Sequence, residues 1–290
     1  MELGVVLLGI ALPFFVLWRL SRTRASTAPE LDVAAEQLGV AHAEQEALYI
    51  AGDGDALKRG LNQHHLALFV PHATALGLYR EVLAAVERAA PELLTGIPEV
   101  ISPDVLEVNF AETLTELGRY DDALRVTSPA SDIPLCEAGR RCARSWVLSL
   151  LGRPEDAVRE LEGVNEPSLL AYRAEYWFNV TFAQLIAGNL DAAADALQRS
   201  RDVMVRESSR RNFYFLLARL RWAQGRRDEA LSHFETAAKH RWRWQGGAGL
   251  LAWGDALKEL GRDDDARAAW AQCISQDPQS LAAAIARQRI

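Results

Sequence analysis

Apolar positions follow helical spacing through most of the chain, and a short polar pattern interrupts them five times. Each copy reads glycine, most often arginine, then acidic residues and a closing alanine, and the copies are 34, 36, 37 and 36 residues apart. They begin at Gly118, Gly152, Gly188, Gly225 and Gly261. A glycine between two apolar stretches can take the left-handed turn that ends a helix, and acidic residues favour the first turn of the next one. This period predicts an all-α fold, an α-solenoid of helix-turn-helix repeats.

Small and large residues recur in phase with these glycines. Small residues stand seven positions before each glycine, at Ala111, Ser145, Thr181, Ala218 and Gly254. Large apolar residues stand four positions after the closing alanine in four copies, at Leu161, Leu197, Phe234 and Trp270. In the first copy Thr127 takes that place. The alternation predicts that two helices approach closely at each turn and bury a large side chain beside it.

This pattern resembles the tetratricopeptide repeat (TPR). Trp177, Tyr214 and Leu250 stand where that family favours an aromatic or large apolar residue, and Asp277-Pro278 stands where it often breaks the chain. The resemblance implies five TPR-like repeats over 102–278 and a surface that binds other proteins. Residues 31–101, with a faint echo of the pattern at Gly77, are expected to form a helical cap or degenerate repeats, and 279–290 a C-terminal capping helix.

An apolar run near the N-terminus predicts a single transmembrane helix over residues 1–20. Leu3 to Trp18 carries no charged side chain, and Arg19, Arg22 and Arg24 follow at once. The run is slightly short for a membrane span but can be extended at both ends. Basic residues after the run place the repeats in the cytoplasm, at the inner membrane of a bacterium.

Two other interpretations of this run stay open: a cleaved signal peptide and a buried or interfacial helix. A signal peptide would carry its positive charge before the run and a small-residue cleavage site after it. The polar residues 21–30 are expected to be a linker. Insertion in the opposite direction would instead give a periplasm-facing envelope assembly factor.

Composition argues against an enzyme, a metal site or a cofactor. The 290 residues are 49% hydrophobic and contain only three cysteines, with no C-x-x-C pair. Cys142 and Cys273 are expected to be buried thiols. His64 and His65 point to different sides of a helix, and neither they nor His72 have acidic or thiol partners at ligand spacing. No nucleophile, phosphate-binding or dinucleotide motif is present.

The charge of −7 is unevenly distributed. Between Arg199 and Arg243 there are twelve lysines and arginines against five acidic residues. Such a block fits either a solvated helix face or a contact with anionic lipid or nucleic acid. Trp242 and Trp244 alternate with Arg241 and Arg243 there, a sequence that resembles a stacking surface for bases only weakly. Nucleic acid is therefore not the expected partner.

The first helix of each repeat is expected to line an inner, concave surface that binds the partner. The predicted groove residues are Trp146, Phe178, Phe182, Asn212, Phe215, Arg219, Trp222 and Lys258, with Glu175, Leu185 and Asp255 facing the same way. Aromatic side chains and arginine dominate binding energy at interfaces, and this lining suits an amphipathic helix or an extended apolar peptide. Some proteins of this family bind the C-terminal carboxylate of a chaperone with polar side chains. Phe178 and Phe182 stand at positions where such a site would need polar groups, so a chaperone-tail adaptor is not expected.

Taken together, these features predict a membrane-tethered scaffold or adaptor for protein partners. The layout resembles bacterial repeat proteins of the lipopolysaccharide assembly protein B type, which are tethered to the inner membrane. Those carry a rubredoxin-like metal module with paired C-x-x-C motifs, which this sequence lacks. The resemblance therefore extends to the layout and not to the specific role.

Overall fold

The computed structural model describes residues 55, 70, 73–74, 76–89, 103–131, 134–164, 173–204, 207–239 and 246–290. Over these residues all regular structure is helical, which confirms the predicted all-α solenoid. The predicted anchor 1–20, the linker 21–30 and His64, His65 and His72 lie outside the described residues. Within the described ranges, no helix has the length and apolar character needed to cross a bilayer.

The helices form pairs around the repeated glycines. After α5 (Tyr79–Ala89) come α7 (Pro103–Glu116) with α8 (Tyr120–Val126), α9 (Pro134–Leu150) with α10 (Pro154–Glu162), α11 (Arg173–Ile186) with α12 (Leu190–Val203), α13 (Glu207–Ala223) with α14 (Arg227–Lys239), and α15 (Gly246–Glu259) with α16 (Asp263–Gln276). The chain ends in α17 (Leu281–Arg289), whose first turn is capped by the Ser280 hydroxyl.

Each turn uses the same pair of backbone hydrogen bonds. At Gly118, where φ is +76°, the amide donates to Thr115 O at 2.9 Å and the next amide, of Arg119, donates to Leu114 O at 2.8 Å. The other four predicted glycines have φ between +70° and +78° and repeat these bonds. Gly77, before α5, has φ of +77° and does the same. The faint echo in the sequence therefore forms a sixth turn of the same type.

Side chains at each turn pack as the repeat pattern predicts. The closing alanines are all 0% exposed: Ala123, Ala157, Ala193, Ala230 and Ala266. In the last pair Trp270 lies over Gly254, where a Cβ would come within 2.3 Å of the indole nitrogen. Thr127 ends the short helix α8, so Ala130 beyond it is exposed. With 7 residues, α8 is the shortest second helix of the described pairs.

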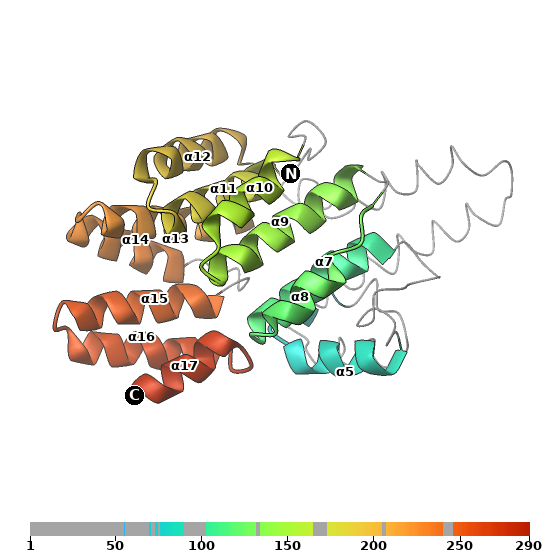
Figure 1. Ribbon diagram of the computed structural model, residues 1–290. Coiled ribbons are helices and arrows are strands. Elements are labelled where there is room, and N and C mark those ends of the chain that lie inside the picture. The colour runs from blue at the N-terminus through green and yellow to red at the C-terminus, as the bar shows by residue number, and fades with distance from the viewer. Residues whose placement is uncertain are drawn as a thin grey trace, which may run out of the picture.

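The repeats follow an arc that brings the two ends of the described chain together (Figure 1). The first helices α7, α9, α11 and α13 pack side by side in sequence, and each second helix also contacts the next first helix. At the junction, the Arg80 amide donates to Gln279 Oε1 at 2.7 Å, and Gln279 Nε2 donates to Glu81 Oε2 at 2.7 Å. A Cβ at Gly118 would lie 3.0 Å from Leu281.

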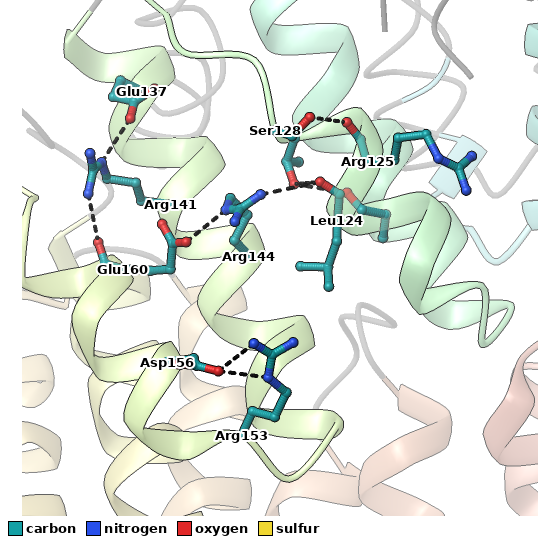
Figure 2. Close-up of polar contacts among 11 residues, drawn as sticks. Leu124, Arg125, Ser128, Glu137, Arg141, Arg144, Arg153, Asp156 and Glu160 are labelled. Atoms are coloured by element: carbon teal, nitrogen blue, oxygen red, sulfur yellow. Dashed lines mark hydrogen bonds and ion pairs between the residues drawn. The ribbon is translucent and has the colours of Figure 1, made fainter. Parts of the chain in front are cut away.

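Arginines tie neighbouring repeats together near α9. Figure 2 shows Arg144 between α10 and α8, where it donates to Glu160 Oε1 at 2.9 Å and to the Leu124 carbonyl at 3.3 Å. On the same helix Arg140 is 3% exposed, forms an ion pair with Glu107 of α7 and donates to the Pro129 carbonyl. These contacts fix α9 against the preceding pair.

Candidate functional site

The same position of every repeat contributes to one row of side chains on the first helices. The position six residues before each glycine is occupied, from α7 to α15, by Glu112, Trp146, Phe182, Arg219 and Asp255. We call these five residues the central row. Because α7, α9, α11 and α13 pack in order, the first four members of the row lie on neighbouring helices. The row is acidic at its two ends and aromatic and cationic in the middle.

The middle of the row is a continuous stack. The Trp146 and Phe182 rings are stacked with centroids 4.4 Å apart. The Arg219 guanidinium carbon lies 5.1 Å from the centre of the Phe182 ring and 5.8 Å from that of Phe215. Trp146 and Arg219 are partly exposed, whereas Phe182 between them is 2% exposed. The two outer members can therefore contact a partner, and Phe182 supports them from below.

The eight predicted groove residues differ in how much surface they offer. Phe178, Phe182 and Phe215 are buried in the core between repeats, so they hold the surface in place and contribute little of it. Trp146, Asn212, Arg219 and Trp222 are partly exposed, and Lys258 is exposed.

Trp222 and Lys258 lie near the turns, away from the stack. The guanidinium of Arg227 lies 3.8 Å from the Trp222 ring centre, and Lys258 forms an ion pair with Asp263 at 3.0 Å. The structure therefore brings together Trp146, Phe182, Phe215 and Arg219 and leaves Trp222 and Lys258 at one edge. Asn212 adjoins Phe215 in a small void of about 10 Å³ between α13 and α15.

Arg219 is a cation held among rings. Burial lowers the pKa of its guanidinium. In the described part of the chain its contacts are with the Phe182 and Phe215 rings, and it forms no ion pair or hydrogen bond there. A guanidinium over an aromatic face is attracted by the ring quadrupole, although less strongly than by a carboxylate. Arg219 thus keeps its hydrogen-bonding groups unused.

The acidic end of the row belongs to a cluster that the sequence did not reveal. Burial raises the pKa of Glu112 and of Glu116 to about 8. The negative charge of Glu116 raises the pKa of Glu112 further, and that of Asp277 raises the pKa of Glu116 further. Asp277 is 4% exposed, its pKa is raised by burial, and its Oδ2 accepts from Tyr79 OH at 3.4 Å. Carboxyls with raised pKa collect where α5 meets the α16–α17 turn, which is the junction of the two ends.

The other acidic end of the row is already engaged. Asp255 Oδ1 accepts from Trp270 Nε1 at 3.1 Å, and Oδ2 lies 3.2 Å from Arg289. Burial raises the pKa of Asp255, and the charge of Arg289 opposes this. The place of Glu112 and Asp255 in the row could have been predicted from the sequence, because both occupy the same repeat position as Trp146 and Arg219. The junction partners Asp277 and Tyr79 carried no such signal.

Part of the arginine-rich block 199–243 is paired with acidic residues where the block is described. Arg226 pairs with Glu229 at 2.6 Å, Arg227 with Glu259 at 3.1 Å and Lys239 with Glu235 at 2.6 Å. Arg199 lies over the Trp177 ring at 4.8 Å. Such pairing reduces the positive potential that nucleic acid binding would require.

The cysteines and acids of the described chain show neither a metal-binding arrangement nor an activated thiol. No group of three or more His, Cys, Asp or Glu within the described ranges is arranged to hold a metal ion. Cys136, Cys142 and Cys273 are free thiols. Burial raises the pKa of Cys142 and of Cys273 to about 12, so both stay protonated and weakly nucleophilic.

The architecture defines the chain as an α-solenoid of helical hairpins, and comparison with known proteins identifies one of these hairpins. A tetratricopeptide repeat family model matches residues 248–280, which hold α15 and α16 with their turn. This segment is similar to a tetratricopeptide repeat, which supports the family that the sequence pattern predicted.

A solved structure shares this fold. The structure of a Rap protein complexed with Competence and Sporulation Factor is similar with a TM-score of 0.53 over 84% of this chain and 77% of that chain. The sequence identity is 13%, so the likeness concerns the fold. No curated protein matches the chain.

Proposed function

We propose that this protein is a scaffold that binds a segment of a partner protein along the central row. The observation that carries the proposal is the continuous stack of Trp146, Phe182 and Arg219 across three successive first helices. Aromatic and arginine side chains held by buried supports are the usual centres of protein interfaces. The Rap protein of similar fold was solved in complex with Competence and Sporulation Factor, and this supports an analogous use of the repeats here.

The second part of the proposal is that residues 1–20 tether the repeats to the inner membrane, with the repeats in the cytoplasm. The support is the apolar run Leu3 to Trp18 followed by Arg19, Arg22 and Arg24. A tether would raise the local concentration of the bound partner at the bilayer. A reporter fused after Ile290 tests the orientation: activity of a cytoplasm-specific reporter supports this part, and activity of a periplasm-specific reporter overturns it.

Partner capture from cells tests the scaffold itself. The full chain, a Trp146→Ala/Arg219→Glu variant and an Arg201→Glu control would be crosslinked and compared by mass spectrometry. Arg201 is exposed on α12 and forms no ion pair within the described chain, so the control makes the same charge change away from the row. We expect partners that the control retains and the row variant loses. Identical partners from all three proteins would contradict the proposal.

A further inference from the structure

We propose that Arg219 binds the side-chain carboxylate of an aspartate or glutamate in the partner segment, next to an apolar side chain that packs on Trp146. This inference rests on the proposed function and specifies the chemistry of its ligand. It would make Arg219 the residue that selects among segments, while the aromatic residues supply general affinity.

The surroundings of Arg219 differ from those of two arginines on α9. Arg140, on α9, is paired with Glu107, and Arg144, also on α9, is paired with Glu160 at 2.9 Å. Arg219, on α13, lies over two rings and has no ion pair or hydrogen bond within the described chain. A cation partly removed from water without an acid partner is costly to the free protein, and a partner carboxylate removes that cost.

Arg219 is already positioned in the free protein. Phe182 lies 5.1 Å from its guanidinium carbon and Phe215 lies 5.8 Å away, and both rings are buried. A guanidinium that is already held on ring faces loses little conformational freedom when it binds a ligand. Its planar N–H donors can form a bidentate pair with a carboxylate. The rings also keep water from screening the new pair.

The neighbours of Arg219 along the row complete the surface for such a segment. Towards α15, Asp255 is engaged by Trp270 and Arg289, so it does not compete for Arg219. Towards α9, the partly exposed Trp146 offers an apolar ring. A segment that carries a carboxylate for Arg219 and an apolar group for Trp146 therefore complements both exposed members of the stack.

The distances also limit how the two groups are spaced in the ligand. Trp146 and Phe182 are 4.4 Å apart and Phe182 and Arg219 are 5.1 Å apart, so the guanidinium carbon lies within about 10 Å of the Trp146 ring centre. Two or three residues of extended chain, at about 3.3 Å each, cover this distance. The expected ligand thus has its acidic residue two or three positions from a large apolar or aromatic one.

Selection from a random heptapeptide library displayed on phage tests this directly. The targets are the detergent-solubilised full chain and its Arg219→Gln, Arg219→Lys and Arg201→Gln variants. Arg219→Gln is checked to unfold within about 2 °C of the wild type, which corresponds to a stability change of at most roughly 1 kcal/mol. Synthetic copies of enriched peptides, with capped termini, are then titrated against all four proteins.

We expect wild type and Arg201→Gln to enrich Asp or Glu two or three positions from a large apolar or aromatic residue. Arg219→Gln should lose that preference and bind the synthetic peptides about tenfold more weakly, the loss of one charge-assisted contact, with Arg219→Lys in between. Equal acidic enrichment on Arg219→Gln, or enrichment of apolar peptides without an acid on the wild type, would overturn this inference alone. If the wild type enriches no peptide, the proposed function fails as well.

Discussion

Arg140 and Arg219 are both arginines of first helices, but their surroundings differ. Arg140 is 3% exposed, pairs with Glu107 of the neighbouring repeat and donates to the Pro129 carbonyl. Arg219 is partly exposed and lies over two phenylalanine rings, with no acid beside it in the described chain. The comparison separates a cation that joins two repeats from one whose hydrogen-bonding groups have no acidic partner within the described chain. Loss of the first should affect folding, and loss of the second should affect binding.

The largest expected effect is the loss of stability in an Arg140→Ala variant. Arg140→Ala leaves Glu107 buried without its ion-pair partner, which typically costs about 3–5 kcal/mol. Urea-induced unfolding followed by circular dichroism would measure the loss. An Arg140→Met/Glu107→Leu double variant should regain much of it, because it removes both charges together. A loss below about 1 kcal/mol in the single variant would show that the pair does not join the repeats.

The next effect concerns the acids at the junction. The pKa of Glu112 and of Glu116 rises from 4.5 to about 8 on folding, so the folded chain holds protons that the unfolded chain releases. Their contribution to stability is therefore lost as pH rises from 4.5 towards 8. A Glu112→Gln/Glu116→Gln variant should have the same free energy of unfolding as the wild type near pH 4.5. At pH 8 its free energy of unfolding should be higher by on the order of 2 kcal/mol, because partial exposure of the carboxyls reduces the effect of the pKa shifts on stability.

Thermal unfolding across this pH range provides the check on the junction acids. The variant should show a flatter decline in Tm between the two pH values than the wild type. Parallel curves for the two proteins would mean that neither carboxyl retains its proton on folding.

A smaller effect is expected from the hydrogen bonds that join the two ends. Gln279→Ala removes the acceptor of the Arg80 amide and the donor to Glu81, a change of about 1 kcal/mol. Hydrogen exchange read by mass spectrometry should become faster at the start of α5 and unchanged in α11 to α14. Unchanged exchange at Arg80 would indicate that the junction is held by other contacts.

The smallest expected effect on stability is that of Arg219→Ala. It removes two cation–ring contacts but also relieves a partly desolvated charge, so the free energy of unfolding should change by less than about 1 kcal/mol. The same urea titration gives the comparison with Arg140→Ala. If Arg219→Ala destabilises the chain as much as Arg140→Ala does, Arg219 is a structural residue and the contrast between the two is lost.

Much of the fold could be predicted because its signals are local. A glycine with positive φ, an acidic first turn and a fully buried alanine are set within a few residues. The positive φ and the acidic first turn recur even at Gly77. The contact of Gln279 with Arg80 and Glu81 spans almost 200 residues and depends on how small angles between repeats add up along the arc. No short pattern encodes that sum, so the junction was not predicted.

The site was predicted in part for the same reason. Repeat register placed Trp146, Phe182 and Arg219 on one side of the first helices, where the stack lies. Register could not tell which of the aromatics would be covered, because the burial of Phe178 and Phe182 depends on neighbouring helices. The raised pKa of Glu112 likewise arises from packing around it, and from sequence it resembled any helix-surface acid.

Site-specific photocrosslinking in cells tests the central claim most directly. A photoreactive phenylalanine derivative would replace Trp146 in one copy of the full chain and Arg201 in another. If the central row binds the partner, Trp146 should give discrete adducts that disappear when Arg219→Glu is added, and Arg201 should give none of them. Adducts from Arg201 alone, or the same adducts from both positions, would contradict the assignment of the central row as the binding surface.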